Sequence, residues 1–115
     1  MAFNDLERKW IERAMEGFLK RRRPPPSIRP QLDIGYRIKG QSVELFSVRP
    51  RFRRPPERAE MPVAKATFVR TREVWKIFWM RADLKWHGYE PASAVGTIDK
   101  FLEVVERDQY GCFWG

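Results

Sequence analysis

Short segments with strand-like patterns, joined by connections of hairpin length, fill the middle of the chain. In residues 32–39 apolar and polar side chains alternate, which is the period of a strand that is buried on one face. Gly40 and Gln41 then supply a tight turn into residues 42–48. Three later segments also have the composition of strands: 63–70, 74–81 and 86–89. Because short connections favour antiparallel neighbours, we expect a meander sheet of four to five strands between residues 32 and 89.

The predicted fourth strand, residues 74–81, is apolar on both of its faces. If Asp83 and Leu84 form a two-residue loop, Arg81 lies opposite Trp86 in the next strand. One face then carries Trp75, Ile77, Trp79 and Trp86, and the other carries Val74, Phe78, Met80, His87 and Tyr89. A sheet with one wet face does not contain such a strand, so we expect the fourth strand to be central and covered on both sides.

An amphipathic helix is predicted before the sheet. Asn4 and Glu7 have the spacing of a capping box, which starts a helix by satisfying the amide groups of its first turn. Apolar residues recur every three to four positions after it, as on one buried helix face. Pro24 to Pro26 lack the amide groups that would continue the helix. The first helix is therefore expected over residues 5–22.

A second helix is predicted after the sheet, over residues 97–108. Thr97 is suited to cap it, and its buried face would consist of Ile98, Phe101, Leu102 and Val105. The apolar residues 112–114 are expected to dock against an edge of the core. The sequence thus predicts one α+β domain, residues 1–115, in which an N-terminal and a C-terminal helix flank an antiparallel sheet.

Positive charge is concentrated in one part of the chain. Lys and Arg total 23 against 15 Asp and Glu, a formal charge of +8. Residues 20–58 alone contain twelve basic and three acidic side chains, so this segment carries a net +9. Within it, residues 49–62 are also rich in proline and are predicted to form a basic, Pro-rich loop. A local positive field of this kind attracts polyanions or acidic protein surfaces.

Two arginine clusters flank the predicted hairpin and suggest binding of nucleic-acid phosphates. The planar guanidinium group suits phosphate oxygens, and Tyr36, Phe46 or Phe52 are candidates for stacking on bases. The alternative is a solvated basic surface that aids solubility. The tryptophans are assigned to the core, since strand alternation accounts for them. The candidate binding residues are Arg21, Arg22, Arg23, Arg29, Arg49, Arg51, Arg53, Arg54 and Arg58.

Catalytic chemistry has few residues to draw on. With one His and one Cys, neither a metal site nor a bound cofactor is expected, and no glycine-rich phosphate loop is present. His87, with Arg81, Tyr89 or Glu90 nearby, is the candidate for acid-base catalysis in a small hydrolase or nuclease; the alternative is a packed, hydrogen-bonded histidine. Cys112 is interpreted as a structural thiol. A non-catalytic module is the favoured prediction.

The second hypothesis, which ranks ahead of the hydrolase, is a protein-interaction domain or a domain that assembles into a homo-oligomer. It rests on the doubly apolar fourth strand and on the five tryptophans. The single cysteine cannot form an internal disulfide, which favours the reducing cytoplasm. Charged residues interrupt every apolar run, so no membrane span is expected.

Four blocks of the chain carry a resemblance to a known family. They are VELFSVRPRF, PVAKATFVRT, WKIFWMRADLKWHGYEP and the ending YGCFWG, in that order. With these blocks the chain resembles the bacterial family called Domain of Unknown Function 3024, over nearly its whole length. The resemblance implies one small bacterial domain and supplies no activity and no catalytic residue.

Overall fold

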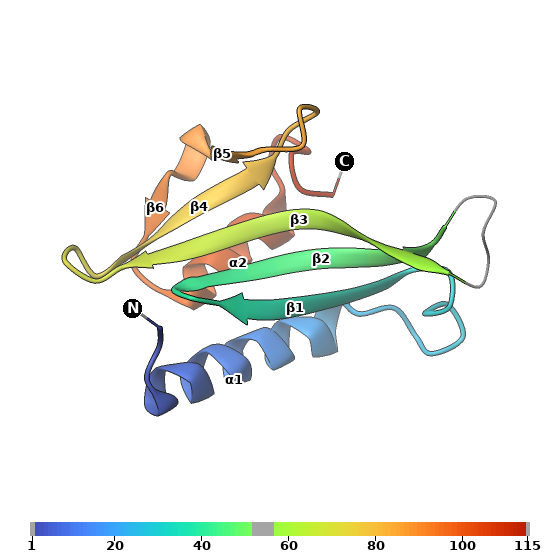
Figure 1. Ribbon diagram of the computed structural model, residues 1–115, viewed down its shortest axis with the longest axis horizontal. Helices are drawn as coiled ribbons and strands as arrows, with labels where there is room; N and C mark the ends of the chain where they lie inside the picture. The colour runs from blue at the N-terminus through green and yellow to red at the C-terminus, as the bar shows by residue number, and fades with distance from the viewer. Residues whose placement is uncertain (1, 52–56, 115) are drawn as a thin grey trace.

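Two helices and six strands make up the part of the chain that the computed structural model describes, residues 2–51 and 57–114 (Figure 1). The strands run in the order β1-β2-β3-β4-β5, and all pairs are antiparallel. The short strand β6 pairs with the first part of β4, on the same edge of β4 as β5. The α+β meander predicted from sequence is confirmed. The elements are α1 (Asp5–Arg22), β1 (Asp33–Lys39), β2 (Ser42–Pro50), β3 (Arg58–Val69), β4 (Val74–Met80), β5 (Trp86–Gly88), the 3-10 helix η1 (Glu90–Ala92), β6 (Ala94–Val95) and α2 (Ile98–Arg107).

Both helices begin at the caps expected from sequence. The Asn4 side chain accepts a hydrogen bond from the Glu7 amide at 2.8 Å, and the Glu7 carboxylate accepts one from the Asn4 amide at 2.9 Å. At α2, the Thr97 hydroxyl accepts from the Lys100 amide at 3.1 Å. These bonds satisfy amide groups that would otherwise have no partner at the helix ends. Among the described residues, neither helix has the length and hydropathy needed to cross a membrane.

The core lies on one face of the sheet, beneath both helices. Ile11, Met15 and Phe18 of α1 pack with Phe101 and Val105 of α2 against the fully buried strand residues of this face, Val43, Leu45, Ala66 and Ile77. In Figure 1, α2 lies behind the strands and none of the described helices lies in front of them. We call the uncovered side the open face. The prediction that β4 is covered on both sides is therefore wrong.

Basic side chains shield the apolar residues of the open face in place of a second layer. The Lys65 ammonium lies 4.8 Å from the ring centroid of Phe78 and 5.2 Å from that of Trp86. The Arg37 guanidinium lies 4.6 Å from the ring centroid of Phe46. Long basic side chains can cover apolar surface while their charges stay in water, so an apolar pattern on both faces of β4 did not require a second layer.

The connection between β4 and β5 is one residue longer than predicted. Leu84 has a φ of 61°, and the Arg81 amide donates to the Lys85 carbonyl at 3.2 Å, which leaves three residues in the loop. Trp86 consequently lies opposite Met80, and His87 lies opposite Trp79. Because a shift of one position exchanges the faces of a strand, Trp86 is on the open face and His87 on the helix side, contrary to the prediction.

The hairpin of β2 and β3 extends into the region predicted as a basic loop. Pro50 pairs with Arg58, so residues 49–50 and 58–62, which were predicted to belong to the loop, lie in β2 and β3. The register shifts between Leu45, opposite Ala64, and Phe46, opposite Pro62, so that Val63 is an extra residue in β3. A bulge is a position where a strand tolerates proline, which explains why Pro62 does not end β3.

Gly35 is required where β1 passes under an aromatic ring. A Cβ atom at this position would lie 2.8 Å from the Phe46 ring, whereas a Cβ atom at Gly88 would meet nothing within 4 Å. We expect Gly35→Ala to lower the free energy of unfolding by about 1–3 kcal/mol, because the ring and the Arg37 side chain above it must shift. Urea unfolding measures the effect. Gly88→Ala is the matched control, and an equal loss in the two variants would contradict this role of Gly35.

Candidate anion-binding groove

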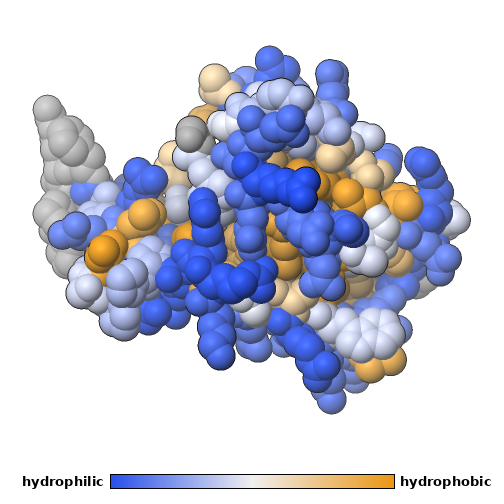
Figure 2. Space-filling view, turned by 180° about the vertical axis from the view of Figure 1, so that it is seen from behind, coloured by the Kyte–Doolittle hydropathy of each residue, from blue (hydrophilic) through white to orange (hydrophobic). Residues whose placement is uncertain are grey.

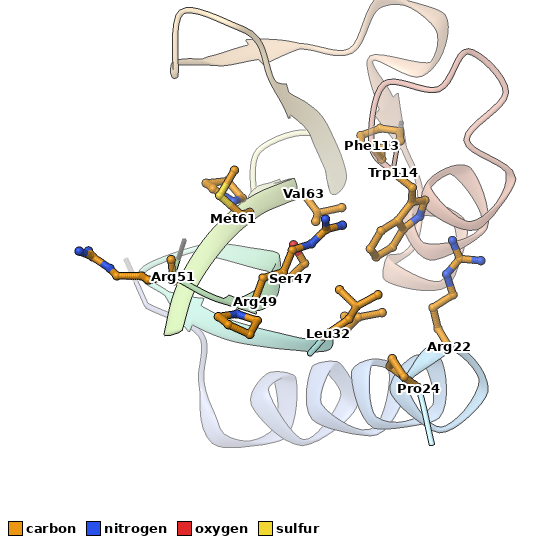
Figure 3. Close-up of a pocket in the computed structure, with 14 residues that line it drawn as sticks. Arg22, Pro24, Leu32, Ser47, Arg49, Arg51, Met61, Val63, Phe113 and Trp114 are labelled. Atoms are coloured by element: carbon orange, nitrogen blue, oxygen red, sulfur yellow. The ribbon is translucent and has the colours of Figure 1, made fainter. Parts of the chain in front are cut away.

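A groove of about 800 Å³ opens at the end of the molecule where α1 stops and the β2–β3 hairpin projects (Figure 3). Strands β1, β2 and β3 form its floor, Pro24 forms one wall, and the C-terminal tail forms the opposite wall. Its volume is in the range of sites that hold small molecules. The lining residues are mostly apolar: Arg22, Pro24, Leu32, Ile34, Ser47, Arg49, Pro50, Arg51, Ala59, Met61, Pro62, Val63, Phe113 and Trp114.

The C-terminal wall is fixed by Asp108, the left-handed residue that ends α2 at a φ of 40°. Its carboxylate accepts hydrogen bonds from the amides of Phe113 at 3.0 Å and Trp114 at 2.8 Å. The Trp114 indole donates to the Val105 carbonyl at 3.0 Å, and Phe113 packs on Tyr89 with ring centroids 4.8 Å apart. The tail is docked as predicted, and the Trp114 ring is held in place facing the groove (Figure 3).

Two arginines from distant parts of the sequence face this groove. The Arg22 guanidinium lies 4.7 Å from the ring centroid of Trp114, and Arg49 follows Ser47 by two positions in β2, on the groove side of the sheet. Within the described residues, no carboxylate lies within 4.0 Å of either guanidinium. Arg51 also lines the groove, but its side chain points away (Figure 3), and its Nε atom is 4.0 Å from Glu57.

Ser47 places a hydroxyl group in the floor between these charges. It follows Val43 and Leu45 on the buried side of β2, and it is the one buried polar residue among those described, with 7% of its surface exposed. No hydrogen bond joins the Ser47 hydroxyl to another described residue. Since every fully buried side-chain polar atom of these residues has a hydrogen-bond partner, the Ser47 hydroxyl is not fully buried and faces the groove that Ser47 lines. Its hydroxyl is therefore available to a ligand. Apolar walls with a few converging polar groups are typical of binding sites.

Other described arginines of the predicted clusters form ion pairs or hydrogen bonds with other parts of the protein. Arg21 pairs with Glu106 of α2 at 2.8 Å. Arg29 donates to the Pro24 carbonyl at 2.8 Å, and Arg58 donates to the Arg29 carbonyl at 2.5 Å. The arginines of the two predicted clusters thus divide into those that contact other parts of the protein and those, Arg22 and Arg49, that face the groove. Three predicted residues, Phe52, Arg53 and Arg54, lie outside the described residues.

Arg23 joins the end of α1 to the start of β1 through Asp33. Its guanidinium donates to both carboxylate oxygens at 2.7 Å, and the Ile34 amide donates to the carboxylate at 2.8 Å. The hydrogen bonds from Arg23 are the main reason that the pKa of Asp33 falls from its usual 3.8 to about 2, and the bond from Ile34 lowers it further. At pH values above 3.8, the usual pKa of an aspartate, the pair stabilises the folded state, and this stabilisation is lost as the pH falls towards 2.

Replacing Asp33 should therefore weaken the protein in a pH-dependent manner. We expect Asp33→Asn to lower the free energy of unfolding by about 1–2 kcal/mol at pH 7, and the difference from wild type to shrink between pH 4 and 2. Urea unfolding at several pH values measures it. Glu90→Gln, at an exposed carboxylate, is the control. A difference that stayed constant down to pH 2 would contradict the assignment to the Arg23 pair.

His87 lies beside a different hollow, of about 550 Å³, on the helix side of β5. Its Nε2 atom is 2.8 Å from an Asp83 carboxylate oxygen, and this hydrogen bond is the main cause of a lowered pKa of Asp83. The residues predicted to accompany His87, namely Arg81, Tyr89 and Glu90, line the same hollow together with Cys112. Burial raises the pKa of Tyr89.

The His87 side chain is hydrogen-bonded to Asp83 and is 35% exposed. Asp83 could orient the imidazole, but acid-base catalysis also requires a reacting group placed within hydrogen-bond reach. Among the described residues, the hydrogen bond found for the His87 side chain is the one to Asp83. Those residues also contain no group of three or more His, Cys, Asp or Glu side chains arranged to hold a metal ion.

Sequence reasoning missed the neutral part of the groove. Ser47 was detectable, because a polar residue at a position that alternates with Val43 and Leu45 is unusual in a core strand. Trp114 had no local signal for its role, since its position depends on the cap at Asp108. Of the stacking candidates, Tyr36 lies on the helix side, where burial raises its pKa, and Phe46 lies on the open face.

Comparison with known proteins gives one match. The family model described as Domain of unknown function (DUF3024) matches residues 3–115, nearly the whole chain. Searches of the curated proteins and of the solved structures found no match.

Proposed function

The chain belongs to the DUF3024 family, a domain of unknown function, and we propose that it is a non-catalytic module that binds nucleic-acid phosphates at the groove between Arg22 and Arg49. One observation carries the proposal. Two guanidinium groups that have no carboxylate partner among the described residues face the same groove, although 27 positions separate them in the sequence. Exposed arginine side chains of this kind are typical contacts to phosphate oxygens.

The groove supports phosphate contact more directly than base reading. Its polar groups are guanidinium groups and one hydroxyl, all of which donate hydrogen bonds to phosphate oxygens. Little base specificity is therefore expected. Compared with the nine arginines predicted from sequence, the proposed contact set is narrower, because Arg21, Arg23, Arg29 and Arg58 make contacts within the protein. The cytoplasm, favoured by the single cysteine, remains the proposed location.

A salt titration tests the groove. We expect the purified protein to bind a fluorescent oligonucleotide at low ionic strength, with an affinity that falls linearly on a log–log plot against salt concentration. Arg22→Ala and Arg49→Ala should each weaken binding several-fold and reduce the salt slope by about 1, because each removes one phosphate contact. Fluorescence anisotropy gives both quantities.

Arg72→Ala is the matched control, since Arg72 is an exposed arginine in the β3–β4 turn, at the other end of the sheet. The Arg72→Ala variant loses the same charge but should leave the salt slope of binding unchanged. No binding at low salt, or equal effects of all three substitutions, would refute the proposed site.

A second candidate function, self-association, rests on an apolar patch at the start of α1. Leu6 is 56% exposed and Trp10 is 60% exposed. Trp10 borders a hollow of about 320 Å³ whose lining is mostly apolar and includes Phe3, Phe68 and Trp75. Large exposed apolar residues beside a hollow are typical of protein interfaces. The prediction from sequence was based on β4 and on the five tryptophans, of which Trp10 and Trp75 of β4 line this hollow. The exposure of Trp10 differs from its predicted place in the core.

Sedimentation at increasing protein concentration tests this candidate. If the patch joins two copies, Trp10→Ser should weaken dimerisation about thirtyfold, as expected for a tryptophan at the centre of an interface. Leu84→Ser, at a residue that is 78% exposed in the β4–β5 loop, is the control. A wild-type protein that stays monomeric at high concentration would exclude it.

A further inference from the structure

The open face combines aromatic and basic side chains along adjacent strands. The register places Phe46 of β2, Phe78 of β4 and Trp86 of β5 on this side, because their neighbours in each strand point into the core. The same alternation gives the charged residues of this face: Arg37, Lys39, Arg58, Lys65 and Lys76, with Asp33, Glu44 and Glu60. Five positive charges thus face three negative ones, and Glu60 pairs with Arg37.

Two of the aromatic rings face a common point above the sheet. Lys65 lies directly opposite Phe78 in the register, and its ammonium is within 5.2 Å of the ring centroids of both Phe78 and Trp86. Both rings are half-buried. Their outer surface is covered by one flexible side chain instead of a packed layer, so a ligand could displace Lys65 without unfolding any element.

The chemistry of this face selects a partner. Successive aromatic rings beside basic side chains are the features that bind single-stranded nucleic acid, in which unstacked bases lie on the rings and phosphates contact the cations. Stacking of a base on a ring is stronger than an exposed contact between a cation and a ring, so exchange of Lys65 for a base is favourable. A second copy of the chain is a poorer occupant, because two positively charged faces would repel each other.

We infer that the open face binds single-stranded nucleic acid, with bases stacked on Phe78 and Trp86 and with Lys65 transferred from the rings to a phosphate. The inference rests on the proposed function in taking nucleic acid as the ligand, but it uses residues on the opposite side of the sheet from the groove. It predicts a preference for single strands over duplexes, whose bases are already stacked and paired.

Anisotropy with a fluorescent oligo-dT and with a duplex of equal length tests the inference. We expect tighter binding of the single strand, and about tenfold weaker binding after Phe78→Leu or Trp86→Leu, at an unchanged salt slope, because these substitutions remove stacking and no charge. Lys65→Met should instead lower the slope, by about 0.7. Tyr110→Leu, at a tyrosine that is 62% exposed after α2, is the control and should bind as wild type.

Ultraviolet crosslinking of the unmodified protein to oligo-dT gives a second readout that does not depend on the folding of a variant. Crosslinks in the peptides containing Phe78 or Trp86 are expected. Crosslinks confined to the Trp114 peptide, a duplex that binds as well as the single strand, or dimers that bury the open face would overturn the inference. If Arg22→Ala and Arg49→Ala weaken binding while the ring variants do not, the open-face inference fails and the groove proposal stands.

Discussion

Burial of one sheet face under two helices is the constraint on which the rest of this structure depends. The helices come from opposite ends of the sequence and share one core through Phe18, Phe101 and Val105, which are fully buried. Both helices are used on that face, so among the described elements none is left for the other face. The protein therefore has two different surfaces, a helix-covered side that is largely hydrophilic on the outside (Figure 2) and an open sheet.

Arginine serves two purposes in the basic end of the molecule. Arg21 and Arg23 connect α1 to α2 and to β1 through carboxylates, and these bonds bring the ends of distant elements together. Arg22, between them in sequence, points to the groove and contacts Trp114. Consecutive residues of a helix point in different directions, so three adjacent arginines acquire three different environments. A count of charges along the sequence could not separate these roles.

The local signals in the sequence predicted the elements well, and the long-range geometry poorly. The caps at Asn4 and Thr97, the prolines after α1 and the alternation of the strands each act over a few residues, and each led to the correct element. The predicted cover of both faces of β4 was wrong, because sequence alternation does not distinguish a second layer from basic side chains lying over rings. The face of Trp86 was wrong because Leu84 adopts a left-handed backbone that favours glycine. For the proposed groove, the sequence drew attention to Arg22 and Arg49 but not to Ser47 and Trp114, since these residues come together only when β2 and residues 113–114 meet.

The extra residue in β3 determines which charges meet across the hairpin. With Val63 inserted, Arg49 lies opposite Ala59, and Glu60 lies opposite Val48, which turns its carboxylate towards Arg37 on the open face. If Val63 were paired with Phe46 instead of bulging out, each earlier residue of β3 would pair one position further along β2, and Glu60 would come opposite Arg49, on the groove side. Loss of the bulge would thus bring a carboxylate beside a groove arginine without any change in composition. The electrostatic character of this end of the molecule is therefore encoded in strand register as much as in residue type.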